Sequence, residues 1–281
     1  MSRQEALDTG GDPDPQGAGL AWQVGVWDRM SQLYTREIDR RFAPVVEAVV
    51  RRGALRPGDR VLDLGTGTGS VALLAAARVT PGGSVLGVDL SPEMLAVARR
   101  RAAAEGVGRC TFREGRAEKV PADAGAFDVV LASLSLMYVI DRAAAAREIA
   151  RVLRAGGRFV AAAWAGPGQC DLVRFQQTAG SFAPPPPVPG VGPGALADPA
   201  PFLAQLAGAG VDATVETEVL GFDFETFAAA WDALARVTAS QLTPRQEREA
   251  KAATLAAMWP QGDGPRHFRN ATHFIVGRKR P

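Results

Sequence analysis

Residues 61–70 read VLDLGTGTGS, a short apolar run that reaches an acid and continues into three glycines at alternate positions. The run suits a buried strand, and the glycines let the backbone turn tightly and approach a ligand closely. Residues 71–79 place apolar side chains on every face of a helix, which is typical of a buried helix. A second apolar run at 84–89 ends at Asp89. This order predicts half of a nucleotide-binding sheet, with a glycine turn that merely joins strand to helix as the simpler alternative.

The glycine spacing narrows the class of ligand. A dinucleotide fingerprint reads G-x-G-x-x-G/A, with its last small residue beside a pyrophosphate. Here Gly65, Gly67 and Gly69 form G-x-G-x-G, and Ser70 stands where that small residue would be. The carboxylate of Asp63 would repel a pyrophosphate and would suit the ammonium group of an amino-acid-like ligand. Both features disfavour a nicotinamide dehydrogenase.

Asp89 indicates which chemical group the ligand carries at its other end. An ionised carboxylate only accepts hydrogen bonds, so it suits a bidentate hold on a ribose diol. The predicted ligand is therefore a nucleoside with a zwitterionic tail and no phosphate. S-adenosylmethionine fits that description.

Four segments, at 63–69, 87–95, 127–130 and 148–159, resemble the ordered motifs of class I S-adenosylmethionine-dependent methyltransferases. The similarity is closest to the small-molecule branch that includes ubiquinone and menaquinone C-methylases, and it is close over roughly 40–165. It implies an α/β fold: a doubly wound, seven-stranded, mostly parallel Rossmann-like sheet with a helical N-terminal cap and a lid insertion before the last strand. The alternation of strand and helix patterns along the chain agrees with that fold.

The chain divides into four expected regions. These are a disordered tail at 1–19, a helical cap at 20–52, a cofactor-binding core at 53–165, and a lid with the C-terminal strands at 166–281. Helical spacing in the cap predicts two helices, separated near Ala43–Pro44. The proline-rich stretch at 184–194 is predicted to be a surface loop, which we favour over a binding motif.

The end of the chain is expected to cover the ligand. Strands are predicted at 213–224 and 271–278, with two helices between them. In the family's fold the last strand is antiparallel, so the intervening insertion of about 45 residues lies at the carboxyl ends of the parallel strands, where ligands bind. It therefore reads as a lid or a wall of the substrate pocket.

The resemblance assigns the methyl-donor pocket to residues from these motifs and from the segment after the fourth strand. They are Asp63, Gly65, Thr66, Gly67, Gly69, Asp89, Leu90, Met94, Arg116, Ala117, Glu118, Ser133 and Leu134. One position departs from the family. Relatives commonly carry an acid that hydrogen-bonds the adenine amine, but Arg116 cannot accept that bond. Either the backbone and Ala117 hold the base without the acid, or donor binding is weaker.

Aromatic residues outside the motifs are candidates for substrate contact. An aromatic wall suits a flat apolar substrate, and packing of cap on core is the equal alternative. Tyr138 either faces the substrate, attracts the sulfonium through its ring, or packs in the core. The substrate-binding candidates are Trp22, Trp27, Tyr34, Met137, Tyr138 and Trp259.

Methyl transfer needs a base only if the acceptor must lose a proton, and histidine is the usual one. The chain has two histidines. We expect His267, just ahead of the last predicted strand and on the ligand side, to be catalytic or to contact the substrate. His273 lies inside that strand and is expected to pack or face solvent.

Composition excludes several classes of partner. The net charge of +2 gives no electrostatic case for nucleic acid, and Cys110 and Cys170 are too few and too far apart for a disulfide framework or a metal site. The segment at 132–138 lacks the N/D-P-P-Y-like sequence of methylases that act on nucleobase or protein amides. No membrane span or leader is apparent, so a cytoplasmic monomer or homodimer is expected.

The sequence thus predicts transfer of a methyl group to a carbon or oxygen of a small acceptor, such as a secondary metabolite or quinone-like ring. A cyclase or isomerase that binds the cofactor without consuming it is the second hypothesis. A non-catalytic partner of another methyltransferase is the third.

Overall fold

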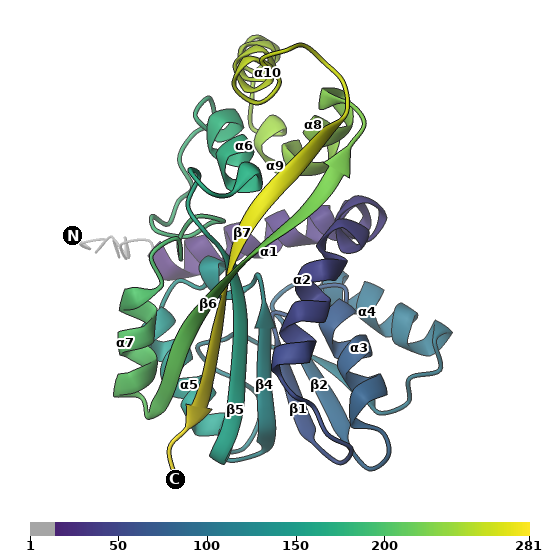
Figure 1. The fold of residues 1–281 in the computed structure, drawn as a ribbon, viewed down its shortest axis with the longest axis vertical. Coiled ribbons are helices and arrows are strands. Elements are labelled where there is room, and N and C mark those ends of the chain that lie inside the picture. The colour runs from purple at the N-terminus through teal and green to yellow at the C-terminus, as the bar shows by residue number, and fades with distance from the viewer. Residues whose placement is uncertain (1–14) are drawn as a thin grey trace, which may run out of the picture.

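A seven-stranded sheet forms the centre of the protein, in a computed structural model that describes residues 15–281 (Figure 1). Its strand order is β3-β2-β1-β4-β5-β7-β6, and β7 alone runs antiparallel to its neighbours. The strands are β1 (Arg60–Leu64), β2 (Ser84–Asp89), β3 (Cys110–Glu114), β4 (Phe127–Ser133), β5 (Leu153–Trp164), β6 (Val211–Phe224) and β7 (Arg266–Lys279). The doubly wound, mostly parallel fold predicted from the motifs is confirmed.

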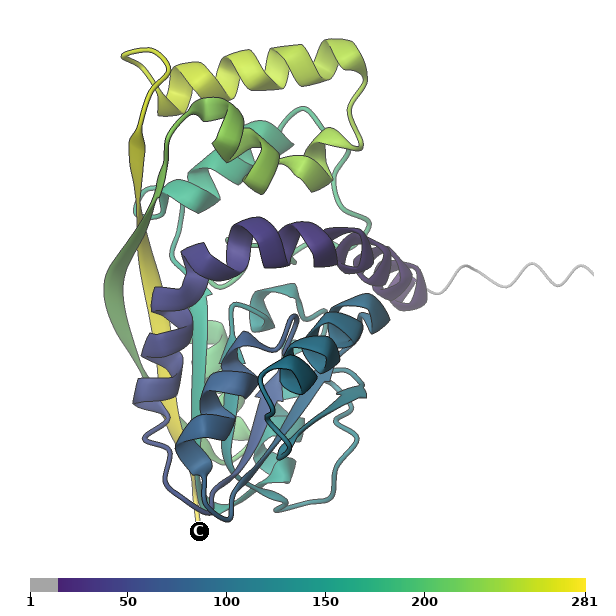
Figure 2. The same cartoon turned by 90° about the vertical axis from the view of Figure 1, so that its right-hand side faces the viewer.

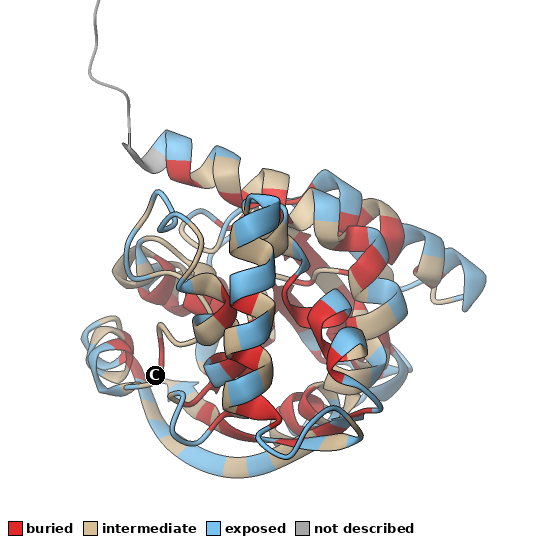
Figure 3. Cartoon of the chain, turned by 90° about the horizontal axis from the view of Figure 1, so that it is seen from above, coloured by how far each residue is buried: buried red, intermediate tan, exposed pale blue. Residues whose placement is uncertain are grey.

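Helices cover both faces of the sheet, α2, α3 and α4 on one and α5 and α7 on the other (Figure 1). Seen from above, the helices are buried on their inner sides and exposed on their outer sides (Figure 3). The α-helices of the chain are α1 (Pro15–Leu33), α2 (Asp39–Arg52), α3 (Ser70–Val79), α4 (Pro92–Ala104), α5 (Arg142–Val152), α6 (Asp171–Gly180), α7 (Ala200–Gly208), α8 (Phe227–Leu234), α9 (Arg236–Ala239) and α10 (Pro244–Met258). A 3-10 turn, η2 (Leu136–Tyr138), follows β4.

The N-terminal cap is interrupted at a different place from the one predicted. A single π-helical turn, η1 (Tyr34–Ile38), joins α1 to α2, and the N–H of Asp39 donates to the carbonyl of Tyr34. Pro44 lies inside α2, where it removes one backbone hydrogen bond without ending the helix. The predicted break at Ala43–Pro44 is therefore wrong. A π-turn frequently marks a functional position, and it changes the direction in which Tyr34 projects.

The last two strands form a hairpin that is longer than the rest of the sheet. They pair over their whole length, from Val211 with Lys279 to Phe224 with Arg266. Strand β5 pairs with β7 only between Thr272 and Arg278, so the far end of the hairpin extends beyond the sheet. Helices α8, α9 and α10 follow that far end, and α1 crosses between them and the sheet (Figures 1 and 2). The lid predicted before the last strand is thus a group of helices.

One segment predicted to be irregular contains helix. Residues 1–14 of the expected tail lie outside the described residues, but 15–19 form the first turn of α1. Helix α6 precedes the proline-rich stretch; Leu172, Val173 and Phe175 bury one face of it, and α6 packs against α10. No helix within residues 15–281 combines the length and apolarity needed to cross a bilayer.

Candidate active site

The glycine loop after β1 is shaped by both conformation and space. Gly65 has a φ of 73°, and its N–H donates to the carbonyl of Val88 at 2.8 Å. A Cβ at this position would lie 2.3 Å from the Cβ of Ser135, whose hydroxyl donates to the carbonyl of Leu64 at 2.7 Å. Only glycine meets both requirements, so the loop passes directly against the start of η2.

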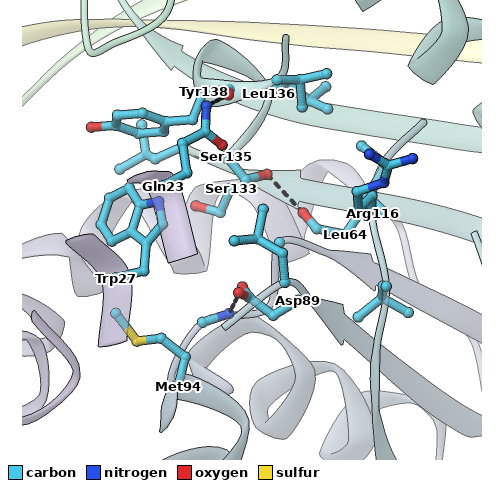
Figure 4. A pocket seen from close by; sticks show the side chains of 18 of the residues that line it. Gln23, Trp27, Leu64, Asp89, Met94, Arg116, Ser133, Ser135, Leu136 and Tyr138 are labelled. Atoms are coloured by element: carbon cyan, nitrogen blue, oxygen red, sulfur yellow. Dashed lines mark hydrogen bonds between the residues drawn. The ribbon is translucent and has the colours of Figure 1, made fainter. Parts of the chain in front are cut away.

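Asp89 is the last residue of β2, and a backbone N–H donates to its carboxylate (Figure 4). One oxygen accepts from the N–H of Gly67 at 2.8 Å and the other from the N–H of Ser91 at 2.9 Å. Burial raises the pKa of Asp89, while these backbone bonds oppose the rise. A carboxylate offers about four acceptor positions, so two remain for a ligand diol.

Asp63 does not occupy the position that its sequence suggested. Its carboxylate is 1% exposed, and one oxygen accepts from the hydroxyl of Thr66 at 2.6 Å. Burial raises its pKa to about 7. Asp63, Thr66 and Gly69 do not line the cleft in front of the loop, so the expected contact of Asp63 with a ligand ammonium group is not supported. Asp63 lies beneath the loop and holds its turn through Thr66.

The cleft in front of the loop, here called the cofactor cleft, brings together all the other predicted donor-pocket residues. It also includes residues that the motifs did not indicate, from α1 and η2. The lining residues are Leu20, Gln23, Trp27, Tyr34, Leu64, Gly65, Gly67, Val88, Asp89, Leu90, Met94, Gly115, Arg116, Ala117, Glu118, Ser133, Leu134, Ser135, Leu136, Tyr138 and Val139. The guanidinium of Arg116 forms no hydrogen bond or ion pair within residues 15–281.

Two acids fix the N-terminal helices to the cofactor motifs. Asp28 of α1 accepts from the hydroxyl of Ser91 at 2.6 Å, at the N-terminus of α4. Asp39 of α2 accepts from the hydroxyls of Thr68 at 2.8 Å and Ser70 at 3.0 Å, next to the glycine loop. Neither contact was foreseen, because the sequence does not show which acid of a polar helix face meets a distant hydroxyl.

A second and larger cavity, about 270 Å³, lies beside the cofactor cleft and is here called the acceptor cavity. Within the described residues, no Asp, Glu, Lys, Arg or His lines it. Its walls come from α1, η1, α2, α6, the proline-rich loop and the region of α8 and α9. The lining residues are Trp22, Gln23, Val26, Trp27, Met30, Tyr34, Ile38, Phe42, Leu134, Met137, Tyr138, Trp164, Leu172, Gln176, Gly180, Ala183, Pro184, Pro186, Val191, Gly192, Pro193, Ala233, Leu234, Val237, Thr238 and Gln241.

Five residues line both cavities: Gln23, Trp27, Tyr34, Leu134 and Tyr138. We call this set the junction. Leu134 has a φ of 55°, a left-handed conformation that a branched side chain rarely adopts and that tends to persist at functional sites. Gln23 is 3% exposed, and its side-chain amide donates to the carbonyl of Tyr138 at 2.7 Å (Figure 4).

The acceptor cavity has a continuous aromatic wall. Tyr138 and Trp27 meet edge to face with ring centroids 4.9 Å apart, and Trp27 meets Tyr34 at 6.4 Å. Tyr34 meets Phe42 at 6.2 Å, and Phe42 meets Trp164 at 5.3 Å. Such an arrangement suits flat or polycyclic apolar molecules, and contact of the cap aromatics with a substrate stays a prediction.

The proline-rich loop forms part of this wall. Pro184, Pro186 and Pro193 line the acceptor cavity, so the loop is more than a surface connection. The guanidinium of Arg142 donates to the carbonyls of Met137 at 3.1 Å and Gly190 at 2.6 Å, and thereby fastens the loop to η2.

Two predicted candidates for substrate contact or catalysis, Trp259 and His267, lie away from both cavities. Trp259 is buried among Phe175, Phe227 and Phe268, so its packing alternative holds. His267 lies within β7 and not ahead of it, and its imidazole meets the carboxylate of Asp223 at 2.8 Å, with 57% of the side chain exposed.

The position of His267 follows from strand alternation, which turns it toward solvent. His273 packs as expected, with ring nitrogens 2.8 Å from the Thr217 hydroxyl and 3.2 Å from the Ala197 carbonyl. Trp22 and Met137 line the acceptor cavity.

Sequence comparisons agree with this geometry. Residues 61–157 match the model of a family described as a methyltransferase domain. The nocamycin O-methyltransferase of Saccharothrix syringae is 38% identical over 133 residues, which are 47% of this chain and 48% of that protein. The ubiquinone/menaquinone biosynthesis C-methyltransferase UbiE of Geobacter sp. (strain M21) is 35% identical over 135 residues, 48% of this chain and 56% of that protein. The chain thus matches these curated relatives over about half their length.

Solved structures share the fold over most of the chain. The YcgJ protein from Bacillus subtilis has a TM-score of 0.62 at 21% identity, covering 84% of this chain and 98% of that one. The cyclase SpnF has a TM-score of 0.55 at 22% identity, covering 85% of this chain and 80% of that one. Sheet order, glycine loop and paired acid define a class I methyltransferase fold. The family match over residues 61–157 agrees with the resemblance to class I S-adenosylmethionine-dependent methyltransferases that the motifs in this segment indicated.

Proposed function

We propose that the protein transfers a methyl group from S-adenosylmethionine to a small organic acceptor, of the secondary-metabolite or quinone-like class. The observation that carries this proposal is the junction, where five residues line both the cofactor cleft and the acceptor cavity. Two ligands in these cavities would meet there. The names of the curated relatives, one an O-methyltransferase and one a C-methyltransferase, are consistent with either acceptor atom.

The cofactor cleft fits the chemical groups of the methyl donor. Asp89 retains acceptor positions for the ribose hydroxyls, and the backbone at Gly65 and Gly67 leaves room for the amino-acid tail. The adenine would lie near Arg116 and Ala117 at the far end of the cleft. Arg116 offers only hydrogen-bond donors, so it cannot take the place of the acid that relatives carry.

Alignment of the two ligands accounts for the catalysis that this site can supply. Bound, the cofactor provides an electrophilic methyl group on a sulfonium. Holding two reactants in line can contribute about 7–11 kcal/mol of rate acceleration. The aromatic wall and residues of the α8–α9 region line the acceptor cavity beside the junction. His267 is exposed and outside both cavities, so it has no place in this proposal.

The test combines donor binding with turnover. Calorimetry should show S-adenosylhomocysteine binding to the wild type and much weaker binding to Asp89→Ala. Labelled S-adenosylmethionine is then incubated with a panel of phenolic and enolic acceptors, and S-adenosylhomocysteine formation is followed by mass spectrometry. Absence of donor binding would refute the proposal. Donor binding with a rearranged product and no donor consumption would favour the cyclase or isomerase alternative instead.

A further inference from the structure

The acceptor cavity restricts the charge of what it can hold. No Asp, Glu, Lys, Arg or His lines it within the described residues, and its polar side-chain groups are those of glutamine, threonine and tyrosine and the indole N–H groups of tryptophan. An ammonium, phosphate or carboxylate group on the part of the acceptor inside this cavity would lose its hydration without finding a counter-charge, which is costly. The body of the acceptor is therefore uncharged and apolar.

No carboxylate is available at the junction to take a proton from the acceptor. Asp89 accepts two backbone N–H groups and serves the ribose side of the cleft. Asp28 accepts from Ser91, and Asp39 is surrounded by Thr68, Ser70 and Arg101. Glu118 faces the backbone of Asp141 and does not line the acceptor cavity. A nucleophile that needs deprotonation in place has no partner here.

Two tyrosines are the titratable groups of the junction, and they act as donors. The rings of Tyr34 and Tyr138 both meet the ring of Trp27 edge to face, with centroid distances of 6.4 Å and 4.9 Å. Neither hydroxyl has a hydrogen-bond partner within residues 15–281. Burial raises the pKa of both above the usual tyrosine range, so both remain protonated near neutral pH. A protonated hydroxyl can donate to an oxyanion but cannot remove a proton.

We infer that the acceptor is an acidic enol or phenol on an uncharged apolar body, which binds in its ionised form with its oxygen held by the hydroxyls of Tyr34 and Tyr138. This rests on the proposed function and, for a phenol, makes oxygen the methylated atom. Methylation of a phenol ring carbon leaves a proton on that carbon, which a base must remove to restore the ring. Methylation of an oxyanion requires no such step.

The reaction then balances without a protein base. The acceptor releases its proton to solvent before it binds. A lone pair of the oxyanion forms the O–CH₃ bond as the S–CH₃ bond breaks, and the sulfonium becomes a neutral thioether. The products are an uncharged ether and S-adenosylhomocysteine, so the attraction between oxyanion and sulfonium disappears as transfer occurs.

The first test measures the ionisation state of a phenol probe bound in the acceptor cavity. 4-Nitrophenol is titrated by absorbance in the presence of excess protein saturated with sinefungin, a cofactor analogue that keeps a positive charge at the sulfonium position but has no methyl group to transfer. We expect its apparent pKa to fall by at least one unit on binding to the wild type. Tyr34→Phe and Tyr138→Phe should each reverse part of that shift, and the double variant most of it. Trp22→Phe, which changes the same cavity without removing a hydroxyl, should retain it.

Probe bound in its neutral form above its solution pKa would overturn the inference, and so would failure of a graded series of phenols to bind. S-adenosylhomocysteine affinity shows whether each variant is folded.

The second test uses turnover with phenols of graded acidity. The midpoint of the rate–pH profile should move with the pKa of each acceptor. A single midpoint common to all acceptors would indicate a protein base and refute the inference, while methyl transfer itself would still stand. No methyl transfer to any acceptor would instead count against the proposed function.

Discussion

Gly65→Ala should destabilise the protein more than the same change at another left-handed glycine. The new Cβ would meet the Cβ of Ser135 at 2.3 Å, and neither atom is the end of a flexible chain. The φ of 73° adds conformational strain. Gly58 is the matched control, because its φ is 89° and nothing lies within 4 Å of its added Cβ.

The magnitude has two parts. A left-handed conformation costs an alanine about 1–2 kcal/mol, which both variants carry. Overpacking in a filled site adds roughly 1–3 kcal/mol, which only Gly65→Ala carries. We therefore expect about 1–2 kcal/mol of lost unfolding free energy for Gly58→Ala and about 2–5 kcal/mol for Gly65→Ala.

Urea unfolding of both variants provides the measurement, and a double-mutant cycle with Ser135→Gly isolates the overlap. Ser135→Gly loses the hydroxyl bond to Leu64, but it also removes the atom that the Cβ introduced by Gly65→Ala would meet. The double variant should be more stable than additivity predicts, by at least about 1 kcal/mol. Equal costs at Gly58 and Gly65, or additive energies in the cycle, would refute the description of this contact.

Three further predictions concern the two cavities and the buried acid. Asp89→Ala should weaken S-adenosylhomocysteine binding on the order of 100-fold in calorimetry, because two charge-assisted hydrogen bonds to the ribose are lost; unchanged affinity would contradict the assignment. Asp63 has a pKa near 7 when folded, so between about pH 4 and pH 7 the folded state holds a proton that the unfolded state lacks. Its contribution makes the unfolding free energy fall as pH rises through that window, by at most ~1.4 kcal/mol per unit, and Asp63→Asn should remove this slope from urea-unfolding data. Arg142→Ala should release the proline-rich wall and raise the acceptor KM roughly tenfold in steady-state assays, with S-adenosylhomocysteine affinity unchanged; a matching loss of cofactor affinity would show that the loop serves the cofactor cleft instead.

Local patterns predicted the cofactor half of the molecule well. The glycines at 65, 67 and 69 and the acid at Asp89 lie within one strand–helix–strand unit, so neighbouring residues determine their positions. The role of Asp63 could not be obtained in this way. Spacing alone does not distinguish a carboxylate that faces a ligand from one that lies beneath the loop and bonds Thr66.

The acceptor cavity could not be predicted from local patterns, because it is formed by long-range contacts. The acceptor cavity is assembled from α1, α6, the proline-rich loop and the α8–α9 region, which are far apart in the chain. His267 was predicted to precede the last strand because only the apolar run at 271–278 was visible in the sequence, whereas β7 begins at Arg266. The pairing of His267 with Asp223 extends β7 beyond the apolar run that was visible in the sequence.

The long β6–β7 hairpin has a consequence for how acceptor range could change. The chain leaves β6 after Phe224 and returns at Arg266, and these two residues are direct cross-strand partners. Opposite residues in an antiparallel pair have Cα atoms about 4.5–5.5 Å apart. The lid is therefore an insertion with adjoining ends, which another segment could replace without altering sheet register or the glycine loop. Residues 225–265 could be exchanged as a single cassette, through recombination in nature or grafting in the laboratory, and the exchange would replace the α8–α9 wall of the acceptor cavity.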